Sequence, residues 1–293
     1  MISILYRKNN GFYIFNEVWD NMIILDACRY DIFEEQYKER RMNGTLQKKI
    51  SRGSHTTTFL IENFIKSNYD DILYITSNPY VDKLIRDKVF KIISVWKEGW
   101  SKKHHTVLPK TMYEYSVNAI INNPDKRLII HFMQPHYPYI GYTIGRNASN
   151  NLKRSISGKP PKKKDSRKKN KRNTDLFSYY CLDLYTIIKR NTHFKLYKNN
   201  LKLALPYVEK LIDLLPGKTI VTADHGEAIG DIFHPLFPIR IYGHDKYLRI
   251  PILTQVPWLS INETEKNINR RTELKEKMML SNKIKNLKMR DKL

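Results

Sequence analysis

Cysteine is scarce in this chain, and long apolar runs are absent from it. Its two cysteines, Cys28 and Cys181, are too few for the disulfide framework of a small secreted domain and suit a reducing compartment. No stretch reaches the roughly 18 consecutive apolar residues of a membrane-spanning helix, so we expect no transmembrane segment. The opening MISILYRKNN becomes charged too soon for a signal peptide. Together these absences predict an intracellular, cytoplasmic protein.

Acidic residues are few beside the basic ones, with 29 Asp and Glu against 52 Lys and Arg and a formal net charge of +23. Segment 151–174 is rich in Lys and Arg and has almost no apolar residues, so it cannot offset the entropy of ordering itself. We predict a disordered insertion there and a basic tail over residues 261–293. Both segments could bind nucleic acid or an anionic membrane surface. Without a base-reading motif, a solvated loop and tail are favoured.

Apolar runs of strand length alternate with helical patterns, which predicts an α/β fold, a three-layer α/β/α sandwich with a mainly parallel sheet. We assign residues 1–260 to one catalytic domain of this kind. The strands are expected at 22–25, 72–76, 91–95, 128–132, 219–222 and 250–254. Helices are expected at 57–66, 109–122 and 195–215, the last with a kink or break at Pro206.

The stretch TIVTADHGEAIGD, residues 219–231, carries the clearest chemical signal. Asp224 and His225 follow a predicted strand and offer a hard oxygen and a borderline nitrogen to a metal ion, while Gly226 allows close backbone approach. Ligands bind beyond the carboxyl ends of the strands in parallel sheets. Residues of the same kind recur in that position or near it: Asp26, His136 and His244. The set predicts a metal-dependent site for phosphate or sulfate esters.

With ILDACRYD, MQPHYPY and YGHDKYLRIPIL, the sequence VTADHGEAIGD resembles the sulfatase-like branch of the alkaline phosphatase superfamily over residues 22–259. The resemblance implies an alkaline phosphatase-like fold, with one or two divalent metals at the sheet edge. It also implies a hydroxyl nucleophile that attacks phosphorus or sulfur. Carried over to this chain, it makes Asp26, Asp224 and His225 the ligands of one metal, which can be manganese, zinc or magnesium.

The resemblance places the nucleophile on the turn SRGSHTTTF, residues 51–59. Thr56 is the first candidate, because the family's G-x-x-T turn leads into a helix whose N-terminus can hold a phosphoryl oxygen. Ser54 is the second. Both can instead be ordinary helix-capping residues. His55, beside Thr56, is interpreted as a turn residue.

Two departures from the family pattern bear on the chemistry. The chain lacks the C/S-x-P-S-R motif that sulfatases convert to formylglycine, and Cys28 is expected to pack as a small apolar residue, so we favour phosphate over sulfate esters. Ile140 stands where two-metal relatives have a histidine. His136 and His244 are therefore expected to bind substrate oxygens or protonate the leaving group. A second metal held by these two histidines remains open.

Arg29 is expected to steady the anions of the site, and Glu227 to orient His225. We therefore predict a metal-dependent hydrolase or transferase for phosphate, or sulfate, esters. The substrate is a phosphorylated or sulfated small molecule, lipid or glycan, and the oligomeric state stays open. Two alternatives are a sulfuric ester hydrolase with an unusual nucleophile and a weakly active binding protein for nucleic acid or an anionic surface on the same fold.

Overall fold

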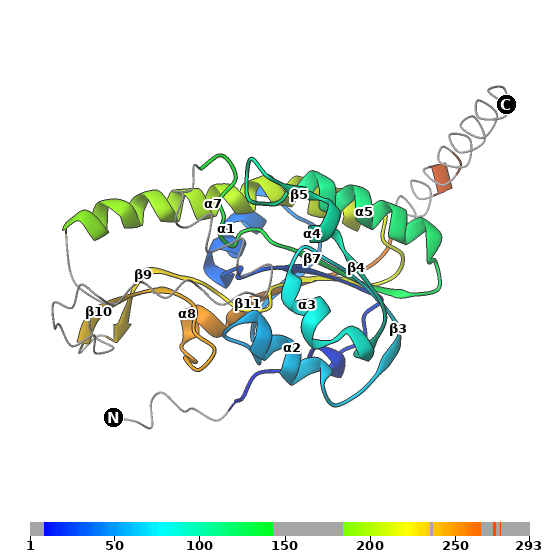
Figure 1. Cartoon of the computed structure of the whole chain (residues 1–293), viewed down its shortest axis with the longest axis horizontal. Coiled ribbons are helices and arrows are strands. Elements are labelled where there is room, and N and C mark those ends of the chain that lie inside the picture. Colours follow the sequence, from blue (N-terminus) through cyan, green and yellow to red (C-terminus); the bar gives the residue numbers. More distant parts are fainter. Residues whose placement is uncertain (1–8, 143–183, 235–236, 265–271, 274–275, 277–293) are drawn as a thin grey trace, which may run out of the picture.

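The computed structural model describes residues 9–142, 184–234, 237–264, 272–273 and 276 (Figure 1). The insertion predicted at 151–174 lies outside the described residues, as do Cys181 and most of the tail predicted at 261–293. Within the described part of the chain, no helix has the length and apolar character needed to cross a membrane.

A seven-stranded sheet forms the centre of the molecule, in the order β2-β11-β8-β1-β7-β3-β4. The five strands from β8 to β4 are parallel, and β11 runs antiparallel to both of its neighbours. These strands are β1 (Asn21–Leu25), β2 (Thr45–Ile50), β3 (Tyr69–Thr76), β4 (Val89–Ser94), β7 (Arg127–Phe132), β8 (Thr219–Thr222) and β11 (Gln255–Ile261). Two small antiparallel pairs lie outside the sheet, β5 (Trp100–Ser101) with β6 (Thr106–Val107) and β9 (Ala228–His234) with β10 (Phe237–Gly243).

Helices cover both faces of the sheet (Figure 1). One face carries α1 (Tyr30–Arg40), α4 (Val95–Glu98), α5 (Pro109–Asn122) and α7 (Leu184–Ile212). The opposite face carries α2 (Thr56–Phe64) and α3 (Pro79–Leu84), with the short helices η2 (Ile14–Asn16) and η3 (Arg86–Lys88) in the chain before and after them. The predicted three-layer α/β/α sandwich with a mainly parallel sheet is confirmed.

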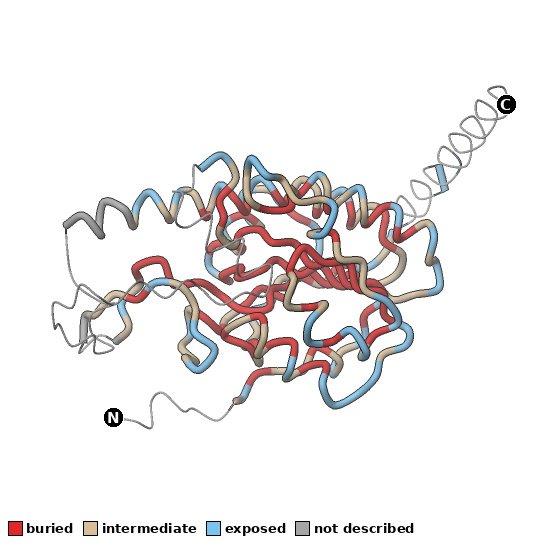
Figure 2. Tube along the Cα trace, in the orientation of Figure 1, coloured by how far each residue is buried: buried red, intermediate tan, exposed pale blue. Residues whose placement is uncertain are grey.

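The central strands are apolar on both sides because each side faces a separate core. Ile23 and Leu25 of β1 belong to the core under α1, α5 and α7, whereas Met22 and Ile24 belong to the core over α2 and α3. Figure 2 shows the buried residues concentrated in these strands. The continuous apolar runs of the sequence are thus the middle of the sheet.

The strand predicted at 250–254 is wrong, since α8 (Pro251–Thr254) forms there and β11 begins at Gln255. Proline at the first position of a helical turn is favourable because its missing N–H has no partner to lose. The edge strand β2, TLQKKI, was not predicted. Most of its residues are exposed and two are lysines, so an apolar pattern cannot reveal it.

Helix α7 continues through Pro206, where the sequence suggested a kink or break. A proline inside a helix costs about 3 kcal/mol or more, because a backbone hydrogen bond is lost and the ring meets the preceding turn. Burial on the sheet offsets that cost. The apolar face of α7 has five fully buried side chains around the proline: Leu201, Ala204, Leu205, Val208 and Leu211.

Candidate active site

The carboxyl-terminal edge of the sheet brings together residues from distant parts of the chain. Asp26 follows β1, and Asp224 and His225 follow β8, its neighbour in the sheet. Thr56 is the first residue of α2, directly after its N-cap His55. All four candidate residues are buried, with Thr56 at 3% exposure and Asp26 at 1%. The sheet edge therefore assembles the predicted metal ligands and the first candidate nucleophile in one place.

Potential ligand atoms of Asp26, Asp224 and His225 all lie within 4.8 Å of one another. His225 Nε2 is 3.4 Å from Asp224 Oδ2 and 3.7 Å from Asp26 Oδ1. Thr56 Oγ1 also lies 3.4 Å from His225 Nε2. The Thr56 hydroxyl thus borders the cluster that can hold a cation.

The hydrogen bonding of His225 fixes which ring nitrogen can bind a metal. Its Nδ1 lies 2.7 Å from the carbonyl oxygen of Gly226, which can only accept, so Nδ1 carries the proton. Burial lowers the pKa of His225 to about 3, so the ring is neutral and Nε2 keeps its lone pair. That lone pair faces carboxylate oxygens. The arrangement is repulsive by itself and favourable around a cation.

The two carboxylates are each satisfied on one side and lack a partner on the other. Asp224 Oδ1 accepts from the backbone N–H groups of Ala27 and His225, both at 2.9 Å, while its Oδ2 has no hydrogen-bond partner. Asp26 Oδ2 accepts from Asn78 at 2.6 Å, while its Oδ1 has none. Buried polar atoms without partners are costly. The donor set therefore fits a divalent metal ion.

Electrostatics point the same way. Burial raises the pKa of Asp26 well above its usual value, and the charge of Asp224 raises it further. Burial also acts to raise the pKa of Asp224, but the nearby His225 and His131 and the Ala27 N–H outweigh it and lower that pKa. A cation between the carboxylates would remove their mutual repulsion and favour the charged form of both.

Two residues of the site were missed by the sequence analysis. His131, near the end of β7, is fully buried, and its Nε2 lies 3.6 Å from Asp26 Oδ2 and 3.9 Å from Asp224 Oδ2. Asn78 caps α3 through Oδ1 and donates from Nδ2 to Asp26 and, at 3.4 Å, to Thr56 Oγ1. A histidine inside the apolar run LIIHF was a usable signal, because histidine is fully buried less often than the aliphatic residues around it. The sequence around Asn78 indicates helix capping and gave no signal of a role in the site.

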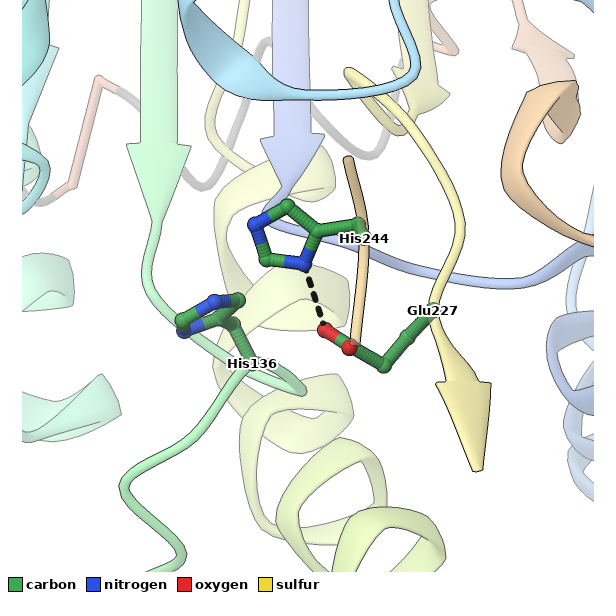
Figure 3. Close-up of side chains that lie close together, drawn as sticks. All are labelled: His136, Glu227 and His244. Atoms are coloured by element: carbon green, nitrogen blue, oxygen red, sulfur yellow. Dashed lines mark hydrogen bonds and ion pairs between the residues drawn. The ribbon is translucent and has the colours of Figure 1, made fainter. Parts of the chain in front are cut away.

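A second group of ligand-type side chains lies beside the first and contains His136, Glu227 and His244, with potential ligand atoms within 4.8 Å of one another. Figure 3 shows the three side chains converging from the loop after β7, the segment after β8 and the chain after β10. The rings of His225 and His244 have their centroids 4.3 Å apart. The two groups therefore form one continuous site.

Glu227 pairs with His244, whereas the sequence led us to expect that it orients His225. Its Oε2 lies 3.0 Å from His244 Nδ1 (Figure 3). Burial acts to lower the pKa of His244, but the Glu227 carboxylate outweighs it and raises that pKa. The same pair lowers the pKa of Glu227 against the opposing effect of burial. Glu227 thus favours the protonated form of His244, as a proton donor requires.

His136 is in a different state. Burial and the neighbouring His244 lower its pKa, and its Nδ1 contacts the carbonyl oxygen of Tyr137. Because a carbonyl oxygen can only accept, Nδ1 carries the proton of the neutral ring, and Nε2 has a lone pair. The two histidines therefore offer an acceptor and a donor at neighbouring positions, 5.1 Å apart between ring centroids.

Three residues named from the sequence have other contacts than expected. Arg29 pairs with Asp31 at 2.7 Å and Asp231 at 3.0 Å, so its expected contact with the anions of the site is not seen. Ser54 Oγ donates to the backbone oxygen of Asp245 at 2.8 Å. A Cβ on Gly226 would collide with the carbonyl oxygen of Ile252, so this glycine permits approach of backbone rather than of a ligand. Cys28 is buried, as expected.

Comparison with protein-family models gave no match, and no curated protein sequence matches the chain. Solved structures do match. The C-terminal periplasmic domain of EcEptC from Escherichia coli, in complex with Zn, has 13% identity and a TM-score of 0.52, over 88% of this chain and 76% of that one. The corresponding domain of the phosphoethanolamine transferase EptC from Campylobacter jejuni has 16% identity and a TM-score of 0.49, over 87% and 82%. An alkaline phosphatase superfamily protein from Vibrio parahaemolyticus has 12% identity and a TM-score of 0.42, over 89% and 62%.

The likeness to the E. coli domain shows a common fold, and the chain has the alkaline phosphatase-like α/β fold that its motifs suggested. The expected cytoplasmic location is contradicted by the E. coli structural relative, which is a periplasmic domain. Low cysteine content misled us. A domain with a core as large as this one needs no disulfides in either compartment, so a low cysteine content does not indicate where the protein works.

Proposed function

We propose that this chain is a metal-dependent enzyme that transfers or hydrolyses phosphate esters through the hydroxyl of Thr56. The observation that carries the proposal is the position of Thr56 Oγ1, buried at the N-terminus of α2 and 3.4 Å from His225 Nε2. The adjacent carboxylates of Asp26 and Asp224 each leave one buried oxygen without a partner. A nucleophile beside a cation site is the arrangement that phosphoryl transfer needs.

Asp26, Asp224 and His225 would hold one divalent cation, for which we propose zinc. Two carboxylates and one imidazole suit a catalytic zinc site, where three protein ligands leave a position open. Zinc in the EcEptC domain is consistent with this choice. Bound there, the ion would lower the pKa of the Thr56 hydroxyl and withdraw charge from the phosphoryl oxygens.

The residues of the chain then divide the chemistry. Asn78 donates hydrogen bonds to Thr56 Oγ1 and to Asp26. These two bonds orient the Thr56 hydroxyl relative to the metal ligands. Thr56 loses its proton to water and its oxygen attacks phosphorus, while the bond from phosphorus to the leaving oxygen breaks. His244 gives its proton to that oxygen. Water or an acceptor hydroxyl next attacks phosphorus and gives a proton to His244, while the bond from phosphorus to the Thr56 oxygen breaks and that oxygen takes a proton back from water. His136 Nε2 can accept a hydrogen bond from the attacking water or from the acceptor hydroxyl.

We further propose that the chain works outside the cytoplasm on a phosphorylated lipid or glycan. The periplasmic domain of EcEptC supports the location. The C. jejuni relative is a phosphoethanolamine transferase. Ethanolamine-bearing phosphodiesters therefore belong among the first substrates to be tested. The missing C/S-x-P-S-R motif speaks against sulfate esters.

The test is hydrolysis of p-nitrophenyl phosphate, its diester and p-nitrophenyl sulfate, together with p-nitrophenyl phosphoethanolamine. Metal-stripped protein receives zinc, manganese or magnesium. We expect release of p-nitrophenol from phosphate esters, restored best by zinc. Activity on the sulfate alone would favour a sulfuric ester hydrolase with an unusual nucleophile. Failure to bind any of the metals would favour a binding protein for nucleic acid or an anionic surface.

The Glu227→Gln variant should shift the pH dependence of the reaction. His244 donates only while protonated, so activity falls as the pH rises through its raised pKa. With the carboxylate gone, burial remains and lowers that pKa, so the alkaline limb of kcat/KM moves to lower pH. General acid catalysis contributes about 10²–10⁴-fold, and a large part of it should be lost at neutral pH and regained under acidic conditions. A pH profile of kcat/KM measures the shift.

Glu209→Gln, which removes a carboxylate paired with Arg40 away from the site, serves as the control and should leave the profile unchanged. The proton-transfer role competes with a second metal at His136, Glu227 and His244. Elemental analysis, which counts the metal ions bound per protein molecule, distinguishes these two roles. Binding of two metal equivalents by the native protein and of one by Glu227→Gln would contradict the proton-transfer role.

A further inference from the structure

His55 has a structural duty that uses only one of its two ring nitrogens. It is the N-cap of α2, and its Nδ1 accepts a hydrogen bond from the backbone N–H of Thr57 at 3.1 Å. The hydroxyl of Thr57 lies at the same distance from Nδ1. Ser, Thr, Asp and Asn are the usual N-cap residues, because a short side chain suffices for this bond. An imidazole at this position therefore brings a second polar atom that the cap does not require.

The cap fixes where the proton of the ring lies. A backbone N–H can only donate, so Nδ1 must present its lone pair to Thr57. The neutral ring consequently carries its proton on Nε2. Nε2 has no hydrogen-bond partner among the residues that the structure describes. The Nε2–H of His55 is thus a hydrogen-bond donor in a fixed orientation, without an acceptor among the described residues.

This donor borders the proposed reaction centre. His55 directly precedes Thr56, and its ring centroid lies 4.9 Å from that of His244 and 6.0 Å from that of His225. The His55 and His225 rings are nearly parallel, with 22° between their planes. His55 is partly exposed, unlike the fully buried His225, so its ring is open to an incoming substrate.

We propose that His55 is a further catalytic residue, whose Nε2–H donates a hydrogen bond to a non-bridging oxygen of the phosphoryl group that Thr56 attacks. The inference rests on the proposed function and adds a residue to it. A donor held in place before the reaction stabilises the charge that develops on the phosphoryl oxygens without reorganisation. The N-cap bond supplies that fixed orientation, so one side chain both begins α2 and faces the substrate.

Two substitutions separate the cap from the donor. His55→Asn keeps an acceptor suited to an N-cap but is too short to place a donor where Nε2 lies. His55→Gln carries an amide N–H₂ at about the depth of Nε2 and is a poor cap. We expect His55→Asn to keep the native Tm and lose about 100-fold in kcat, the loss typical of one oxyanion donor. His55→Gln should lower Tm by about 2–4 °C and retain kcat within about 10-fold of the native value.

The opposite pattern would overturn the proposal. If His55 only caps the helix, His55→Asn will turn over like the native protein and His55→Gln will be the impaired variant. Binding provides a readout that does not depend on turnover. Titration of zinc-loaded protein with inorganic phosphate should show about 10-fold weaker binding for His55→Asn and near-native binding for His55→Gln.

Failure of the proposed function is distinguishable from failure of this inference. If native protein shows no turnover that depends on Thr56, the proposed reaction is wrong, and the phosphate titration alone decides the role of His55. Equal phosphate affinities for native protein and His55→Asn would then exclude the donor. Weaker binding by His55→Asn would assign His55 to an anion site on this fold.

Discussion

Replacement of Thr56 by alanine is expected to reduce kcat by at least about 1,000-fold while the fold is retained. Loss of a nucleophile is among the largest effects of a single substitution, because no other group can form the covalent bond. Thr56→Ser keeps the hydroxyl and should retain measurable turnover. Initial rates with p-nitrophenyl phosphate or its diester, on protein reloaded with zinc, measure the difference.

Ser54→Ala is the matched control for Thr56→Ala. Both substitutions remove one hydroxyl from the same turn, but Ser54 Oγ already donates to the backbone of Asp245. We therefore expect near-native turnover from Ser54→Ala. The reverse result, with activity lost in Ser54→Ala and kept in Thr56→Ala, would move the nucleophile to Ser54. Mass spectrometry of acid-quenched protein should find the covalent phosphoryl group on the peptide that contains Thr56.

The Asp224→Asn variant should lose its response to zinc and keep its stability without it. Native protein at a free zinc concentration of about 100 times Kd gains about 2.7 kcal/mol of unfolding free energy. That gain corresponds to a rise in Tm of about 5–10 °C for a chain of this size. Asparagine is isosteric and weakens zinc binding by more than about 100-fold, since even residues behind the ligands change affinity by 10–100-fold. The rise in Tm should therefore largely disappear.

Metal-free Asp224→Asn should be at least as stable as metal-free native protein. Asparagine Oδ1 can still accept from Ala27 and His225, and its N–H₂ can donate to Asp26 Oδ1, which otherwise has no partner. Scanning calorimetry with and without zinc tests both statements. Asp71→Asn, at the start of β3 and paired with Arg127, is the control and should keep the full response. An undiminished zinc response in Asp224→Asn would place the metal elsewhere.

Much of the fold could be predicted because it depends on local patterns. The apolar runs around Ile23, Ile129 and Ile220 are buried on both faces, which only a central parallel strand requires. Elements without such a pattern were missed or misplaced, including the charged edge strand β2 and the helical turn α8. Pro206 lies within a continuous helix because side chains distant in sequence cover its apolar face, which the local rule does not include.

The sequence by itself determined the residue types and the edge of the sheet where Asp26, Asp224 and His225 gather, because carboxyl ends of parallel strands meet there. Only the tertiary structure decided the partners of these groups. Glu227 pairs with His244 instead of His225, Asn78 joins Asp26 to Thr56, and His131 lies behind both carboxylates. The physical reason is that a hydrogen bond forms only when donor and acceptor lie at the right distance to within a few tenths of an ångström. For segments far apart in the chain, only the tertiary structure sets that distance. Those distances also fix the proton on each histidine and so its chemistry.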